Sequence, residues 1–122
     1  MRVRHTTAGS LFVIRITENM ITCYIKYELN DQKIADFEHY AKLWIPLVEK
    51  FGGTHHGYFL PHESASDLAV ALFSFPSLAK YEEYRKASFE DAECQAAFAF
   101  AKETNCIRRY DRQFLRPVGV KM

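Results

Sequence analysis

The sequence predicts an α+β domain in which one antiparallel sheet carries its helices on one face. Three observations support this prediction. Segments with an apolar residue at every second position, typical of strands, alternate with segments whose apolar residues recur every three or four positions, as in helices. One strand-like segment, LAVALFSF over 68–75, is apolar on both faces, as expected for the centre of a sheet. Of the 122 residues, 48% are hydrophobic, which suits a single domain with a core of its own.

The first predicted elements are a strand and a long helix. The strand over 21–29 places alternate side chains on one face: Ile21, Cys23, Ile25, Tyr27 and Leu29. The helix over 32–51 has apolar residues at spacings of three and four: Ile34, Phe37, Ala41, Trp44, Val48 and Phe51. Pro46 removes a backbone donor inside this helix, so we expect a kink or a break near 42–45. Gly52 and Gly53 then close the helix.

Three further strands are predicted. THHGYFLP over 54–61 is rich in aromatic and branched residues and ends at a proline, as does a strand that leads into a turn. The polar stretch HESASD is that turn, and the two-faced apolar strand over 68–75 follows it. CIRRYDRQFL over 106–115 alternates again and predicts the last strand.

A second helical region is predicted between the last two strands. Ser77 follows Pro76 and begins a helix, whose inner side carries Leu78, Tyr81, Tyr84 or Arg85, and Ser88. Ser88 is followed three residues later by Asp91, which resembles a capping box. We therefore expect a second helical piece over 89–102.

The resulting order from Met20 onward is βαββαβ, the arrangement of ferredoxin-like folds, with one antiparallel sheet and both helical regions on one of its faces. The other face of such a sheet also requires cover, because the central strand is apolar on both sides. A second copy of the chain is the most economical cover, so the sequence predicts a homodimer built sheet to sheet.

Charge and cysteine content exclude several classes of protein. The 16 basic and 15 acidic side chains nearly cancel, so we expect no nucleic-acid partner. No apolar run approaches the roughly 20 residues of a membrane span. The three cysteines are far apart and form no CxxC pair, which favours a reducing, cytoplasmic location. We predict an N-terminal extension over 1–19, one domain over 20–118 and a C-terminal tail over 119–122.

Three strings resemble the NIPSNAP family of dimeric α/β-barrel proteins: GGTHHGYFLPHES, LAVALFSFPSLAKYEEYR and RRYDRQFLRPV. The resemblance runs over most of 20–118, and its strongest parts are ALFSFPSLAKYEEYR and the closing FLRPV. It implies a ferredoxin-like protomer paired into a dimeric barrel. It implies no defined reaction, because the family's biochemical role is unsettled, whereas related barrel superfamilies include cofactor-free monooxygenases, haem-binding proteins and muconolactone-isomerase-like enzymes.

The adjacent histidines His55 and His56 are the first candidates for chemistry. In a strand they point to opposite faces, so they cannot chelate one metal together, and at most one enters a cavity between sheet and helices. One packed and one exposed histidine is the simpler interpretation; a single cavity histidine acting as base, proton relay or haem ligand is the alternative. No HxH, HExxH or Cys/His cluster is present, so we expect neither a metal nor a cofactor.

A ligand cavity is the second candidate. Tyr24, Trp44, Tyr58 and Phe73 could line an apolar pocket with a few polar tips, although they could equally be core. The last strand carries a local excess of arginine: Arg108, Arg109, Arg112 and Arg116. Such arginines can clamp a carboxylate or phosphate, but more often they pair with acids such as Glu28 and Glu63 across strands or across a dimer interface.

Two functions therefore remain open. The first is a NIPSNAP-like homodimeric binding or interaction protein with a cavity for a small apolar or aromatic molecule. The second is a cofactor-free monooxygenase- or isomerase-like enzyme of the same superfamily. Its catalytic candidates are His55, His56, Tyr24 and Arg109, the arginine stabilising developing negative charge.

Overall fold

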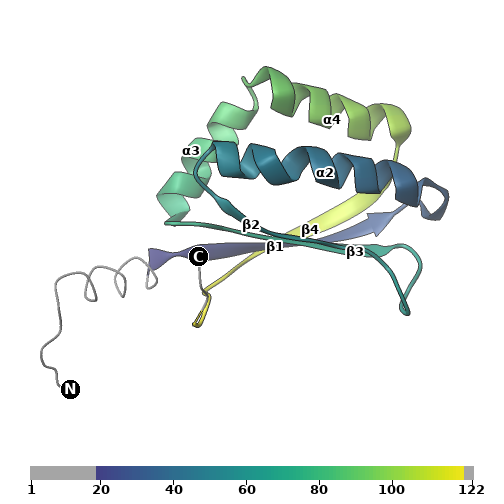
Figure 1. The fold of residues 1–122 in the computed structure, drawn as a ribbon, viewed down its shortest axis with the longest axis horizontal. Helices are drawn as coiled ribbons and strands as arrows, with labels where there is room; N and C mark the ends of the chain where they lie inside the picture. Colours follow the sequence, from purple (N-terminus) through teal and green to yellow (C-terminus); the bar gives the residue numbers. More distant parts are fainter. Residues whose placement is uncertain (1–18, 120–122) are drawn as a thin grey trace, which may run out of the picture.

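A computed structural model describes residues 19–119 of the chain and shows two layers, a sheet and the helices on one of its faces (Figure 1). The elements in chain order are β1 (Ile21–Leu29), η1 (Asp31–Lys33), α2 (Ile34–Lys50), β2 (Thr54–Phe59), β3 (Leu68–Phe75), α3 (Leu78–Ser88), α4 (Ala92–Thr104) and β4 (Ile107–Leu115). This confirms the predicted α+β, ferredoxin-like fold. The extension predicted over 1–19 and the tail predicted over 119–122 lie almost entirely outside the described residues.

The sheet has the strand order β2-β3-β1-β4, and every neighbouring pair is antiparallel. Cys23 in the middle of β1 is level with Phe73 on one side and Phe114 on the other, and these three side chains face the helices. Thr22 and Ser74, one position along, face the opposite way and hydrogen-bond to each other at 2.7 Å. We call the two sides of the sheet the helix face and the open face.

The core lies between the helix face and α2. Leu29, Phe37, Val48 and Phe75 are all 1% exposed or less. Gly53, at the start of β2, passes so close to this core that a Cβ there would lie 2.7 Å from Phe75 Cζ and 2.8 Å from Val48 Cγ1. Only glycine fits at that position, which explains the second glycine of the pair that closes α2.

Two local features differ from the sequence predictions: α2 has no break, and α4 has a different cap. α2 runs without a break through Pro46, because that residue lies on the solvent side of the helix, where water can satisfy the carbonyl that loses its donor. The cap of α4 is Asp91, not Ser88: the Asp91 carboxylate accepts from the Cys94 backbone N–H at 3.0 Å. The Ser88 hydroxyl instead donates to the Arg85 carbonyl at 2.8 Å, and α4 begins at Ala92.

Candidate functional site

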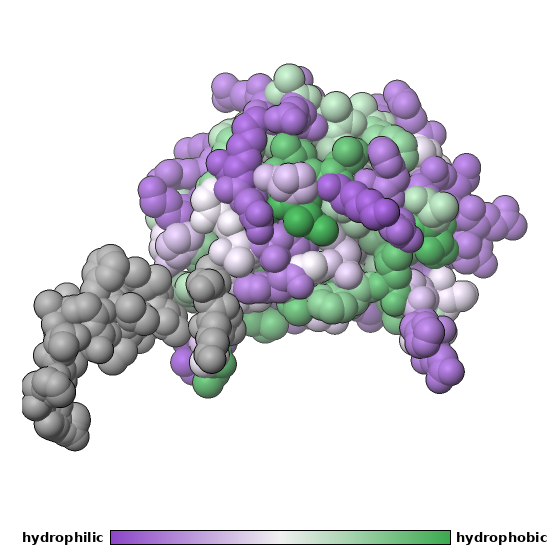
Figure 2. All heavy atoms as spheres, viewed as in Figure 1, coloured by the Kyte–Doolittle hydropathy of each residue, from purple (hydrophilic) through white to green (hydrophobic). Residues whose placement is uncertain are grey.

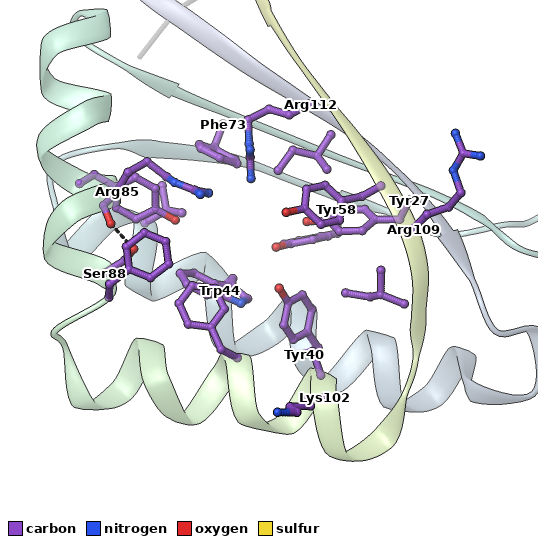
Figure 3. A pocket seen from close by; sticks show the side chains of 18 of the residues that line it. Tyr27, Tyr40, Trp44, Tyr58, Phe73, Arg85, Ser88, Lys102, Arg109 and Arg112 are labelled. Carbon is purple, nitrogen blue, oxygen red and sulfur yellow. Dashed lines mark hydrogen bonds between the residues drawn. The ribbon is translucent and has the colours of Figure 1, made fainter.

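A cavity of about 590 Å³ lies between the helix face of the sheet and the helices that cover it (Figure 3). Its floor is formed by β1, β2, β3 and β4, and its walls by α2, α3 and α4. The cavity exists because α4 packs against α2, with Phe98 and Trp44 at 5.1 Å between ring centroids, and leaves the helix face of β4 partly uncovered. Tyr110 and Phe114 on that strand are accordingly 50% and 46% exposed.

Tyrosines dominate the cavity lining: Tyr27, Tyr40, Tyr58, Tyr81, Tyr84 and Tyr110. Burial raises the pKa of Tyr40 to about 12, and it raises the pKa values of Tyr27 and Tyr58 well above the usual range for a phenol. These hydroxyls therefore stay protonated at neutral pH, where they can donate hydrogen bonds but are poor bases.

Trp44, the only tryptophan of the chain, forms part of the α2 wall. Its ring contacts Tyr40 and Phe98, at 6.3 Å and 5.1 Å between centroids. The indole Nε1 is buried beside the Tyr40 hydroxyl, yet no hydrogen bond of ordinary geometry satisfies it. A buried donor without a partner is costly, so this atom is a ready contact for a bound molecule.

Two arginines point into the cavity, Arg85 from α3 and Arg112 from β4 (Figure 3). Each lies against an aromatic ring, with Cζ of Arg85 5.3 Å from the Phe89 centroid and Cζ of Arg112 5.4 Å from the Tyr110 centroid. The Nε atom of Arg112 is buried and has no hydrogen-bond partner. Among the residues that the structure describes, no aspartate or glutamate lines the cavity.

The other arginines of β4 behave as the alternative interpretation predicts, because they pair across strands. Arg108 and Arg109 contact the two carboxylate oxygens of Glu28 on β1, at 3.4 Å and 3.2 Å. A register shift at Glu28 and Leu29 brings both arginines to the same acid. Arg109 borders the cavity, but its guanidinium points away from it (Figure 3) and pairs with Glu28 on the open face, the face that also carries Tyr24.

The two adjacent histidines point to opposite faces of the sheet. His55 lies on the helix face, stacked on Tyr58 at 4.9 Å between centroids, and its Nδ1 accepts from the Gly57 backbone N–H at 2.9 Å. His56 lies on the open face, where its Nε2 contacts the Ser74 hydroxyl at 2.8 Å. His55 packs behind Tyr58 and does not line the cavity. Burial, and then the nearby His56, lower the pKa of His55 to about 4, so it is neutral at pH 7.

Of the four side chains predicted to line a pocket, Trp44, Tyr58 and Phe73 do border the cavity. Tyr24 lies on the open face, because its parity in β1 is that of Thr22. The structure thus separates the catalytic candidates: His55 lies behind the cavity, whereas Tyr24, His56 and Arg109 share the open face. Arg85 was predicted only as one of two alternative residues on the inner side of its helix, although its spacing from Tyr81 places both on one helical face.

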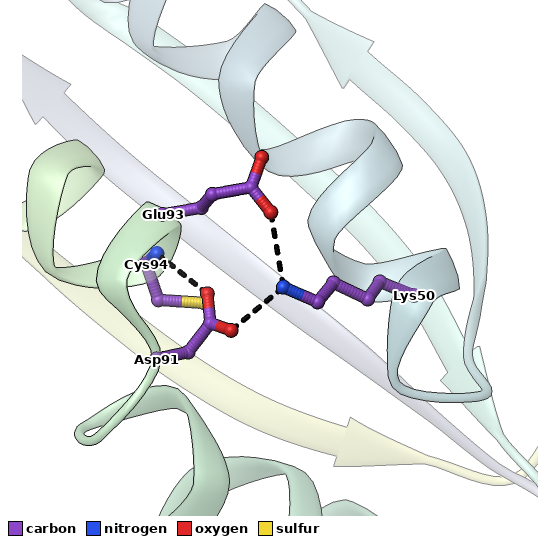
Figure 4. Close-up of polar contacts among 4 residues, drawn as sticks. All are labelled: Lys50, Asp91, Glu93 and Cys94. Atoms are coloured by element: carbon purple, nitrogen blue, oxygen red, sulfur yellow. Dashed lines mark hydrogen bonds and ion pairs between the residues drawn. The ribbon is translucent and has the colours of Figure 1, made fainter.

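An ion-pair cluster joins the helices that cover the cavity (Figure 4). Lys50, at the end of α2, donates to Asp91 at 2.6 Å and to Glu93 at 3.0 Å, both at the start of α4. These hydrogen bonds raise the pKa of Lys50 and lower that of Asp91.

Within 19–119 no group of three or more histidine, cysteine or acidic side chains could hold a metal ion. No helix in this range is long and apolar enough to cross a membrane.

Comparisons with known proteins give a family and a fold. The family model described as NIPSNAP matches residues 23–120, while no curated protein matches the chain. A NIPSNAP family protein of unknown function from Agrobacterium tumefaciens has a similar structure, with a TM-score of 0.71 and 18% identity over 82% of this chain and 89% of that one. A NIPSNAP-like domain protein from Burkholderia xenovorans has a TM-score of 0.69 and 17% sequence identity, over 86% of this chain and 90% of that one.

A more distant structure extends the comparison of folds. A putative antibiotic biosynthesis monooxygenase from Nitrosomonas europaea gives a TM-score of 0.65 and 8% identity over 84% of this chain and 93% of that one. At such low identity, likeness to these solved structures establishes the fold alone.

Proposed function

This chain belongs to the NIPSNAP family, and from that premise we propose that it is a homodimeric protein that binds a small apolar or aromatic molecule in the cavity under its helices. The cavity itself is the observation that carries the proposal. Its volume of about 590 Å³ is of the size that proteins use for small ligands. Its walls are aromatic, with a few polar tips to orient a bound molecule.

The open face supports the homodimer. Phe59 and Leu115, which lie at opposite edges of this face, are 53% and 45% exposed. Leu68, Val70 and Leu72 of β3 lie between them and are only half-buried within one protomer. Figure 2 shows apolar residues along the lower border of the molecule, beneath the sheet. A second copy packed on this face would bury that surface and leave the cavity, on the other side, free.

Binding is favoured over catalysis by the residues that line the cavity. A cofactor-free monooxygenase or isomerase needs a base to remove a proton from its substrate. The buried tyrosines are poor bases, because their pKa values are raised, and the neutral His55 packs behind Tyr58. The enzyme remains the second candidate, because the tyrosine hydroxyls and Arg112 could stabilise an anion, and because the fold resembles that of the Nitrosomonas europaea protein.

The three cysteines support the predicted reducing, cytoplasmic location. Cys23, Cys94 and Cys106 are all free and buried. Burial raises the pKa values of Cys23 and Cys94 to about 11, which makes both thiols unreactive.

Occupancy of the cavity can be measured through Trp44 fluorescence, since the chain has no other tryptophan. We expect 4-cyclohexylbenzamide to change this fluorescence saturably. Ala101→Phe, which fills the cavity from α4, should abolish the change, whereas Ala99→Phe on the exposed side of the same helix should retain it. An unaltered titration in Ala101→Phe would contradict binding in this cavity. Deuterium gained from the solvent at a carbon atom of the bound compound, only when the protein is present, would instead favour the enzyme.

The oligomeric state is tested by light scattering at micromolar protein concentration. We expect a dimer for the native chain and a monomer for Leu72→Asp, because the substitution places a charge in the centre of the open face. Lys26→Asp, on the same face but at a position that is exposed in the protomer, serves as the milder comparison. A monomeric native protein would contradict the homodimer.

A further inference from the structure

We propose that the molecule bound in the cavity is an apolar or aromatic carboxylate, whose charged end is held between Arg85 and Arg112. This inference rests on the proposed function, because it requires the cavity to be a binding site. It adds the chemical class of the ligand and the residues that select it.

The first observation is that two arginines at the cavity have no acidic partner. Within 19–119, six lysines and arginines have an acidic partner within 4 Å: Lys33, Lys42, Lys50, Lys80, Arg108 and Arg109. Of the basic side chains without one, Lys26, Lys86, Lys102 and Arg116 are exposed to water, whereas Arg85 and Arg112 are partly buried. Within 19–119 neither Arg85 nor Arg112 has such a partner, and no acid lines the cavity. A partly buried guanidinium without a counter-ion is unfavourable, and a bound carboxylate would supply that counter-ion.

The positive charges of Arg85 and Arg112 influence the same two side chains, Tyr81 and Cys23. Burial raises the pKa of Tyr81, and both Arg112 and Arg85 oppose that rise through their charge. The Cys23 thiol behaves in the same way, and its pKa is raised to about 11 despite the two arginines. Figure 3 shows one arginine descending from β4 and the other reaching across from α3 towards the same space. One end of the cavity is therefore positive, from two independent elements of the fold.

The remainder of the cavity suits the uncharged part of the ligand. Trp44, Tyr27 and Tyr58 present their rings there, and Tyr27 and Tyr58 lie 6.2 Å apart between centroids. The free Nε1 of Trp44 and the unpartnered Nε of Arg112 are both donors, and no acceptor-only side chain lines the site. The lining thus offers hydrogen bonds to an acceptor and stacking surfaces to a ring, a combination that selects an aromatic or cyclic acid over an amine.

Three compounds of one shape test the charge preference: 4-cyclohexylbenzoate, 4-cyclohexylbenzamide and 4-cyclohexylbenzylamine, titrated against the native full-length protein by Trp44 fluorescence and calorimetry. We expect the carboxylate to bind at least about tenfold more tightly than the amide, which is the effect of one charge-assisted hydrogen bond. The amine should bind most weakly. Arg85→Met and Arg112→Met should each remove most of the difference between carboxylate and amide, whereas Arg85→Lys and Arg112→Lys should retain part of it.

Lys86→Met is the matched control, because this lysine is the neighbour of Arg85 on α3 but is exposed and does not line the cavity. It should leave the preference unchanged. Equal binding of carboxylate and amide, or a preference that survives both methionine substitutions in variants with native circular dichroism, would overturn the inference and leave the proposed binding function intact. Failure of all three compounds to bind would overturn the proposed function itself.

Discussion

The two faces of the sheet differ in what they bury and in how they treat charge. The helix face carries an aromatic core around Phe73 and Phe75, both at most 5% exposed, and beside it a cavity into which Arg85 and Arg112 point without an acidic partner among the described residues. The open face carries a polar cluster of Thr22, Ser74 and His56 at one end, and at the other end Glu28 paired with two arginines. Half-buried aliphatic residues of β3 lie between these two groups.

This difference shows how one alternating strand can serve two purposes. Successive residues of β3 contribute in turn to a sealed core and to a surface suited to a second copy. Polar groups on the open face are satisfied within the protomer, so that face is suited to packing as it stands. On the helix face, buried polar atoms of Trp44, His55 and Arg112 have no hydrogen-bond partner among the described residues. Trp44 and Arg112 border the cavity, so that face is suited to a ligand.

The largest effect should come from removing a core ring on the helix face. Phe75→Ala should lower the free energy of unfolding by about 3–5 kcal/mol, because the side chain is fully buried and leaves a cavity. Leu72→Ala on the open face of the same strand should cost about 1 kcal/mol within a protomer, because Leu72 is half-buried there. Urea unfolding measures both.

The variants Leu72→Ala and Phe75→Ala should also respond differently to protein concentration. The loss of stability in Leu72→Ala should depend on protein concentration, because that variant weakens the proposed dimer. The loss of stability in Phe75→Ala should be the same at every concentration. Similar costs for the two variants at every concentration would remove the distinction between the faces.

The polar cluster of the open face gives the next effect. Ser74→Ala should destabilise the protein by about 2 kcal/mol, because Ser74 is 0% exposed and its removal leaves Thr22 and His56 without their partner. The double variant Thr22→Val with Ser74→Ala should recover part of the loss, since fewer unsatisfied groups remain. Thermal unfolding followed by circular dichroism checks both variants; equal stability of Ser74→Ala and the native protein would show that the cluster contributes nothing.

On the helix face, His55 makes stability depend on pH. Its pKa is about 4 when folded and about 6.5 when unfolded, so only the unfolded chain binds a proton between these values. The contribution of His55 to the free energy of unfolding is complete above pH 6.5 and is lost as the pH falls towards 4. Because solvent screens the charge of a partly exposed ring, we expect a loss of about 1 kcal/mol near pH 5. His55→Leu should flatten this dependence in urea unfolding, whereas the exposed His62→Leu should not. An unchanged slope in His55→Leu would mean that the ring is protonated in the folded state.

Much of this fold could be predicted from the period of the apolar residues. Alternation located β1 over 21–29 and β3 over 68–75 at the bounds that the structure has, and parity separated His55 from His56 even though a bulge lies between His55 and Gly57. Local sequence patterns gave wrong predictions where contact with water or a competing side chain determined the structure of a helix. Pro46 left its helix unbroken because it faces water, and Asp91 replaced Ser88 as a cap.

The site was less accessible to sequence reasoning, because it depends on how distant elements pack. Nothing local indicates that α4 leans on α2 and uncovers β4, which is what creates the cavity. The arginines of the last strand look alike in sequence, but a register shift gives Arg108 and Arg109 to Glu28 and leaves Arg112 unpaired. Arg85 could have been found by noting that it shares a helical face with Tyr81, four residues earlier in the same predicted helix.

The smallest effect should come from the ion pairs above the cavity, which involve neither face of the sheet. Lys50→Met should lower the melting temperature slightly, because its contacts to Asp91 and Glu93 are near the surface and screened by salt. Asp91→Ala should lower it more, since the same carboxylate also caps α4, and Asp91→Asn should fall between the two because it keeps the cap. In 1 M salt the deficit of Lys50→Met should nearly vanish while that of Asp91→Ala persists. If the two deficits fell together, the Asp91 carboxylate would stabilise α4 through its charge on Lys50 alone, and its cap on the Cys94 backbone N–H would contribute nothing.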